Sequence, residues 1–147
     1  LMYQVIQQFL QAVGIQTEIN SYDSSSWLDV RKSGEMDAYI NTWTMDYNDP
    51  ANIMFTFFGG AEKTQIRSLN YPNEEVMARV AAASGITDDA ARMAEYQALE
   101  KQIVEEDAAW VPLLGNTHLF AIGERVERFV PYWAGYSNFY ARNVVLK

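Results

Sequence analysis

The stretch WTMDYNDPANIMFTFF, residues 43–58, joins a tryptophan and two aspartates to an apolar run. The run predicts a short helix over residues 50–58, ended by the pair of glycines that follows. Asp-Pro is typical of a turn or a helix start, because proline is favoured at the first helical position. We therefore assign Asp49 and Pro50 a structural role. The other aspartate, Asp46, lies earlier in the turn, and its role depends on what precedes it.

The segments before this turn predict alternating helices and strands. Apolar residues recur at helical spacing over residues 2–13, and Gly14 is a typical helix stop. Residues 15–22 predict a short strand, residues 24–32 a helix, and residues 37–44 a strand rich in β-branched and aromatic side chains. A strand, a helix and a strand with short loops predict a right-handed crossover and a parallel pair. The predicted fold class is α/β, with a mixed sheet flanked by helices.

The segments after the turn are expected to be mostly helical. Residues 61–72 are expected to form a loop. Helices are expected over residues 73–84 and 87–107, with Asn73 and Thr87 as the capping residues. A last strand is expected near residues 144–146.

The composition limits the function classes. The chain has 147 residues, 49% of them hydrophobic and 14% aromatic, which is typical of a folded domain rather than a disordered segment. The net charge is −8 and no Lys/Arg cluster occurs, so nucleic-acid binding is disfavoured. The absence of cysteine excludes disulfides and thiolate metal sites. No apolar run approaches the ~20 residues of a membrane span.

Asp46 is the leading candidate for a ligand contact. It lies just beyond the predicted strand 37–44, and ligands bind at the carboxyl ends of strands in open α/β sheets. A carboxylate flanked by Trp43, Met45 and Tyr47 can hold an ammonium group. A solvated turn explains the same residues, so both interpretations stay open at this point. Two further rings, Tyr132 and Trp133, lie in an aromatic, irregular tail and are candidates for a cleft wall.

An enzyme is the main alternative. A pair of carboxylates can hydrolyse glycosides, and Asp46 with Asp49 or Glu62 could form such a pair, although nothing in the spacing selects it. The sequence has no Ser nucleophile elbow, Gly-rich phosphate loop or metal-spaced His/Asp cluster. We therefore expect no catalytic residue, no metal and no cofactor.

Four stretches, in this order, resemble one family. They are GIQTEI (14–19), GEMDAYINTWTMDYNDPANIMFTFF (34–58), ARMAEYQALEKQIVEEDAAWVPLL (91–114) and ERFVPYW (127–133). Together they resemble the C-terminal part of bacterial solute-binding proteins of the peptide/nickel class, family 5. These proteins are the extracytoplasmic receptors of ABC importers. The likeness covers nearly the whole chain.

The resemblance implies a fold, a ligand and partners. Family members have two α/β lobes that close over a solute in a hinged cleft, a type II periplasmic-binding-protein arrangement. Residues 1–147 are expected to be a single C-terminal lobe, truncated at its N-terminal side. The expected partners are an oligopeptide or another small solute, a membrane permease and the missing N-terminal lobe. The expected location is periplasmic or on the outer face of the cytoplasmic membrane, with or without a lipid anchor.

The resemblance also assigns a role to two residues of the turn. In peptide-binding relatives the aspartate of a Trp-x-x-Asp turn pairs with the α-ammonium of the peptide. That aspartate matches Asp46, and the tryptophan matches Trp43.

The strand missing from the predicted sheet would leave an open edge, so we also expect dimers between copies of this chain.

Overall fold

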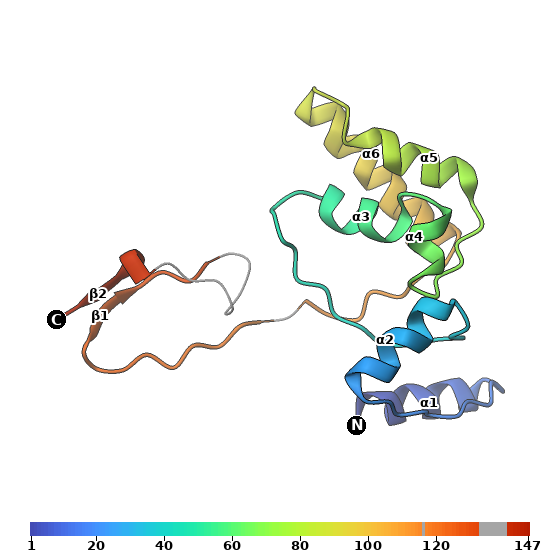
Figure 1. The fold of residues 1–147 in the computed structure, drawn as a ribbon, viewed down its shortest axis with the longest axis horizontal. Helices are drawn as coiled ribbons and strands as arrows, with labels where there is room; N and C mark the ends of the chain where they lie inside the picture. The colour runs from blue at the N-terminus through green and yellow to red at the C-terminus, as the bar shows by residue number, and fades with distance from the viewer. Residues whose placement is uncertain (116, 133–140) are drawn as a thin grey trace.

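The computed structural model describes residues 1–115, 117–132 and 141–147, and Figure 1 shows their arrangement. Helices α3 to α6 lie together, α1 and α2 lie next to them, and the two strands lie apart from the helices (Figure 1). The elements in chain order are α1 (Met2–Ala12), α2 (Ser24–Ser33), α3 (Ala51–Phe58), α4 (Ala61–Gln65), α5 (Glu74–Ala83), α6 (Asp89–Lys101), the π-helical turn η1 (Gln102–Glu106), β1 (Val126–Phe129), the 3₁₀ turn η2 (Ala141–Asn143) and β2 (Val144–Leu146).

The hydrophobic core is built by α3, α5, α6 and η1. Phe58, Val80, Leu99 and Ile103 are completely buried in it. Phe58 makes edge-to-face contacts with Trp110, at 4.8 Å between ring centroids, and with Tyr71. Burying side chains of this size contributes roughly 1.5–3 kcal/mol each. The core therefore fixes the positions of the segments at both ends of α3.

Most helix boundaries follow the sequence. The Asp23 carboxylate accepts hydrogen bonds from the Ser25 and Ser26 N–H groups at the start of α2. Gly34, with φ of 80°, ends that helix in the left-handed conformation that glycine adopts without strain. Asn73 caps α5 as predicted, by accepting from the N–H of the third residue after it.

Two local predictions about these helices are wrong. Asp88, rather than Thr87, caps α6 and accepts from the N–H of Ala91 at 2.7 Å. Aspartate is the stronger capping residue of the two, so it displaces the threonine by one position. The expected loop over residues 61–72 contains the short helix α4.

The predicted parallel strand pair and mixed sheet are also wrong for the described residues. Residues 15–22 and 37–44 form no strand, and the described sheet is the antiparallel pair β1–β2 alone. A strand needs a neighbour that completes its backbone hydrogen bonds. Here side chains of α1 bind the two segments instead. The Gln7 amide donates to the Thr17 carbonyl at 2.7 Å, and the Tyr3 hydroxyl donates to the Ile40 carbonyl at 3.1 Å.

The predicted strand near residues 144–146 is confirmed as β2. It pairs with β1, which the sequence did not predict, with Val126 opposite Leu146 and Phe129 opposite Val144. No helix in the described part of the chain is both long and apolar enough to cross a membrane. The assignment of the chain to a single C-terminal lobe stays a prediction.

Candidate functional site

The loop that leads into α3 is fixed at its first residue. The indole N–H of Trp43 donates to the side-chain amide oxygen Oδ1 of Asn52 at 2.8 Å, and Asn52 is buried in the first turn of the helix. The Trp43 ring packs edge-to-face on Phe57, with 5.1 Å between ring centroids. Trp43 still keeps 37% of its surface exposed. It therefore anchors the loop and also offers part of its ring to a neighbouring molecule.

The same loop is fixed at its other end by Asp49. One carboxylate oxygen accepts from the Ala51 N–H at 2.9 Å, and the other accepts from the Arg92 guanidinium of α6 at 2.5 Å. Burial opposes ionisation of Asp49, but the Ala51 N–H and the Arg92 guanidinium outweigh it and hold the pKa below its ordinary value. The structural role predicted for Asp49 is confirmed. An ionised, fully engaged carboxylate is a poor general acid, which weighs against the glycosidase alternative.

Asp46 and Tyr47 lie between these two fixed ends and project from the loop. Tyr47 is 51% exposed, and Asp46 is also exposed. No hydrogen bond or ion pair joins the Asp46 side chain to any residue within the described ranges. Its carboxylate is therefore available to an external cation.

The two remaining candidates come from the C-terminal segment. Tyr132 is half-buried and follows β1, in the part of the chain that Figure 1 shows apart from the helices. Trp133 lies outside the described residues. One loop thus carries three of the candidates, Trp43, Asp46 and Tyr47, because they are near neighbours in the sequence.

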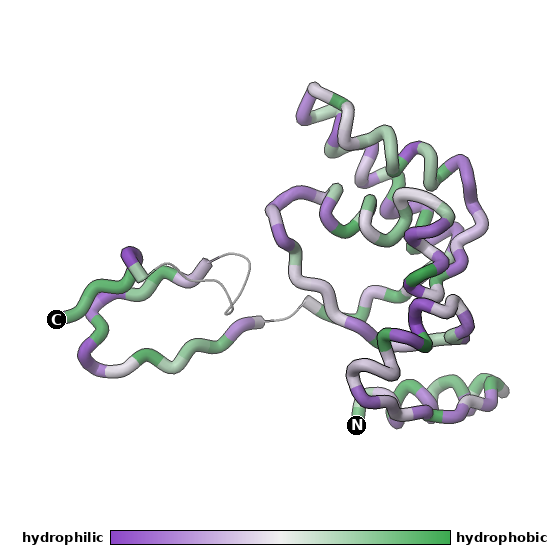
Figure 2. Tube along the Cα trace, in the orientation of Figure 1, coloured by the Kyte–Doolittle hydropathy of each residue, from purple (hydrophilic) through white to green (hydrophobic). Residues whose placement is uncertain are grey.

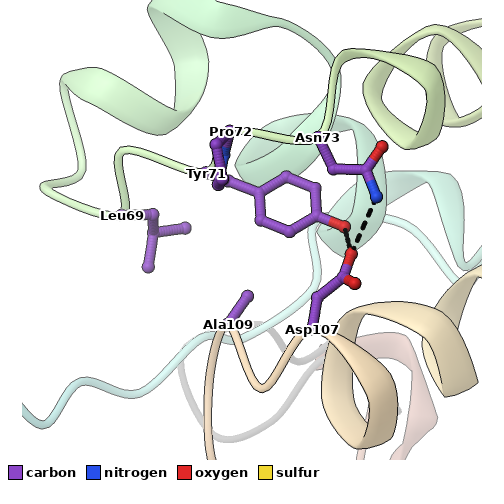
Figure 3. A pocket seen from close by; sticks show the side chains of 6 residues that line it. All are labelled: Leu69, Tyr71, Pro72, Asn73, Asp107 and Ala109. Atoms are coloured by element: carbon purple, nitrogen blue, oxygen red, sulfur yellow. Dashed lines mark hydrogen bonds between the residues drawn. The ribbon is translucent and has the colours of Figure 1, made fainter.

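A separate recess lies at the other end of α3, where the chain leaves η1 (Figure 3). It has a volume of about 330 Å³. Among the described residues, none of those predicted as ligand contacts lines it. Its walls are Leu69, Tyr71, Pro72, Asn73, Asp107 and Ala109.

At this recess, the donors that bind the Asp107 carboxylate are all neutral groups. The Tyr71 hydroxyl and the Asn73 amide, at 3.0 Å, donate to one carboxylate oxygen, as Figure 3 shows. The Gln102 amide donates to the other at 3.0 Å. These bonds, the one from Tyr71 first, hold the pKa of Asp107 below its ordinary value. Burial and the neighbouring carboxylate together raise the pKa of Tyr71.

Sequence reasoning missed this cluster and the Arg92 partner of Asp49. Both join residues 34 to 43 positions apart, so no local pattern reports them. The sequence carried one signal, the acidic residue at position 107 directly after the apolar positions of a helix. In the structure, a π-helical turn ends the helix there. The described residues contain no group of three or more His, Asp or Glu side chains placed to hold a metal ion.

Comparison with known proteins finds one matching family and several similar relatives. Residues 1–65 match the family described as "Bacterial extracellular solute-binding proteins, family 5 Middle". The chain is 30% identical over 125 residues to a probable D,D-dipeptide-binding periplasmic protein of Escherichia coli, an alignment that covers 84% of this chain and 24% of the relative.

Two other relatives align over most of the chain. The heme-binding protein A of Haemophilus influenzae is 26% identical over 132 residues, covering 90% of this chain and 24% of the relative. The periplasmic oligopeptide-binding protein of Escherichia coli is 24% identical over 140 residues, covering 91% and 24%. The chain thus spans about a quarter of the length of these relatives. No solved structure matches it. Residues 1–65 thus match the bacterial extracellular solute-binding proteins of family 5, and most of the chain is similar to periplasmic binding proteins.

Proposed function

We propose that this chain is part of the extracytoplasmic solute-binding component of an ABC importer, and that its loop over residues 43–50 binds the cationic end of a peptide or related small solute. The family match over residues 1–65 supports a binding role rather than catalysis. Two of the relatives reported above are described as binding a D,D-dipeptide or oligopeptides, and both are described as periplasmic. A peptide therefore heads the candidate solutes for this chain.

The observation that carries the proposal is the contrast between the two aspartates of the loop. Asp49 is engaged by Ala51 and Arg92, whereas Asp46 is exposed and has no partner among the described residues. The fixed ends of the loop hold Asp46 in place without neutralising it. A peptide α-ammonium is cationic below its pKa of about 8 and would supply the missing charge.

The neighbouring rings suit this ligand. A charge-assisted hydrogen bond from ammonium to Asp46 is worth roughly 1.5–3 kcal/mol. Trp43 and Tyr47 flank the carboxylate and present partly exposed rings that can cover the ligand backbone. Tyr132 and Trp133 are further candidates for a cleft wall. Such a site grips one terminus and tolerates varied side chains.

The remaining parts of the proposal concern the whole receptor. A second lobe would close over the solute about a hinge, and the closed form would dock on a membrane permease. Residues 1–147 would then form most of one lobe. Because this lobe supplies only some of the walls of the cleft, we expect the chain alone to bind peptides more weakly than micromolar.

Titration of the isotope-labelled chain with a tripeptide tests the proposal, followed through the Trp43 indole N–H resonance. We expect the N-acetylated tripeptide to bind at least about tenfold more weakly, since it lacks the cation. Asp46→Asn should weaken the free tripeptide by a similar factor. Asp37→Asn, which removes another exposed carboxylate between α2 and this loop, is the matched control and should change affinity less than twofold.

The losses from acetylation and from Asp46→Asn should not add, because both remove the same ion pair. Equal weakening by Asp46→Asn and Asp37→Asn would contradict the assignment of the ammonium to Asp46. Turnover of a glycoside that disappears in Asp49→Asn would replace the binding function with the enzyme alternative.

A further inference from the structure

Two arginines that play no part in the proposed solute site each lie over an aromatic ring. The Arg31 guanidinium lies over the Trp27 ring, 5.0 Å from its centroid. Trp27 meets Tyr39 edge-to-face at 6.0 Å, and the Tyr39 hydroxyl donates to the Arg67 carbonyl at 2.5 Å. The Arg67 guanidinium lies over Phe57 at 5.1 Å. The end of α2 and the segment after α4 thus each place a cation on an aromatic face, and Tyr39 contacts both segments.

The backbone around these arginines is fixed by hydrogen bonds between the two segments. The Ser68 hydroxyl donates to the Arg31 carbonyl at 2.8 Å, and the Asn70 amide donates to the Gly34 carbonyl at 2.8 Å. The Gln65 amide donates to the Ser33 carbonyl at 3.1 Å. Three bonds between residues more than 30 positions apart hold the two guanidinium groups on the same side of the molecule.

The two charges are not balanced by an acid. Within the described ranges, no carboxylate lies within ion-pair distance of Arg31 or Arg67, although the chain carries 19 acidic and 11 basic residues. The buried Nε atoms of both arginines lack a hydrogen-bond partner there. By contrast, Arg79 pairs with Glu95 at 2.8 Å, and Arg92 pairs with Asp49. Arg31 and Arg67 thus lack the acidic partner that Arg79 and Arg92 have.

Both side chains are half-buried. Burial, and then the nearby Arg31 guanidinium, lower the pKa of Arg67. Contacts with aromatic faces offset part of this cost, about 0.5–2 kcal/mol for each cation. One N–H of Arg67 donates to the Lys63 carbonyl at 3.2 Å, and within the described ranges the two guanidinium groups make no other hydrogen bond. Their remaining N–H groups match the planar geometry of an oxyanion.

We propose that Arg31 and Arg67 form a binding site for an oxyanion, a carboxylate or a phosphate, on the surface defined by Trp27 and Tyr39. The anion accepts from terminal N–H groups of both guanidinium groups. Tyr39 keeps Arg67 in place through its backbone carbonyl. The site does not depend on the proposed function of Asp46, which lies on a different loop.

The test uses the whole 147-residue chain and follows the arginine Nε–H resonances by NMR. Sodium succinate and sodium phosphate are the probes, and sodium chloride at equal ionic strength is the reference. We expect saturable shifts at Arg31 and Arg67 with at least one probe and none beyond the salt reference at Arg79. The probe that binds more tightly identifies the carboxylate or the phosphate as the source, and either result supports the site.

Variants separate a built site from general attraction. Arg67→Gln and Arg31→Gln should each weaken the probe at least about tenfold, because each removes one charge-assisted contact. Arg79→Gln changes the net charge equally and should alter affinity less than twofold. Arg67→Lys keeps the charge but loses the planar fork, so it should weaken probe binding by an intermediate factor. This variant serves as the test if Arg67→Gln disturbs the fold.

Two outcomes would overturn the proposal. One is a response to both probes that sodium chloride reproduces. The other is an equal loss in Arg79→Gln and Arg67→Gln, which would indicate unspecific charge. Asp46→Asn should leave oxyanion binding unchanged, so failure of the peptide site and failure of this site give different results.

Discussion

The chain divides into two regions that have similar sequence patterns and different burial. Residues 51–103 contain every buried residue of the described structure, and residues 1–50 contain none. Yet α1 has an apolar stripe as regular as that of α6. Phe9 and Val13 on α1 are 70% and 73% exposed, whereas Leu99 on α6 is completely buried. Figure 2 shows the hydrophobic residues that run along α1.

The comparison shows that an apolar helical face is buried only where another element packs against it. Helices α3, α5 and α6 follow one another closely, so each finds the next within a few turns of chain. The stripe of α1 and the extended segments 15–22 and 37–44 belong to a layer that needs strands to pack on. The described residues supply no such sheet to them. Region 1–50 therefore keeps helices and extended runs but builds no core.

Truncation of a core side chain should give the largest contrast between the regions. Leu99→Ala should lower the free energy of unfolding by about 2–5 kcal/mol, because it leaves a cavity among completely buried neighbours. Phe9→Ala should change it by less than about 0.5 kcal/mol, because that ring is mostly exposed. Urea unfolding followed by circular dichroism measures both. Comparable losses in the two variants would show that α1 packs on the core in solution.

Association through the unpartnered region should be the next largest effect. The exposed face of α1 and the extended segment 15–22, which pairs with no strand in the described structure, predict dimers at high concentration. Phe9→Glu should weaken the dimer by about tenfold or more, since burying a phenylalanine contributes roughly 1.5–3 kcal/mol. Sedimentation velocity over a concentration series measures this. A monomer at every concentration would contradict the prediction.

The sequence predicts local structure well and long-range pairing poorly. Helix starts at Asn73 and near Ser24 depend on capping within three residues, and the structure confirms both helices. The strands over 15–22 and 37–44 were wrong because β-propensity describes a surface that fits a sheet, and no local signal shows whether the sheet is present.

The candidate site shows the same limit. The structural role of Asp49 followed from the Asp-Pro pair, but its Arg92 partner lies 43 positions away and could not be predicted. The availability of Asp46 also depends on such partners. Its lack of one emerged only from the structure, because an arginine on any nearby helix would have neutralised it.

Removal of the Asp49 carboxylate should have a moderate effect that depends on pH. Asp49→Asn should cost about 1 kcal/mol at neutral pH, since it weakens one cap and one partly exposed ion pair. The pKa of Asp49 is lower in the folded state, so its contribution is complete above the ordinary value of about 3.9 and is lost as pH falls below it. The difference between wild type and variant should therefore shrink on acidification. A difference that stays constant from pH 7 to pH 2 would contradict this origin.

The smallest effect should arise at the recess beside the core, where Asp107 accepts the Tyr71 hydroxyl. Because burial and the Asp107 carboxylate raise the pKa of Tyr71, it should ionise after the exposed tyrosines in a titration of the tyrosine Cζ resonances. The folded state then binds the phenolic proton more tightly, so stability falls as pH rises above the ordinary value of about 10. Asp107→Asn should shift the Tyr71 pKa down but leave it above ordinary, since burial remains. Glu106→Gln removes the adjacent charge and should leave Tyr71 unchanged. If Tyr71 ionised at the ordinary pKa of about 10 in the wild type, the contact between the η1 end and the core would be open in solution, and the boundary between the packed and unpartnered regions would move to include it.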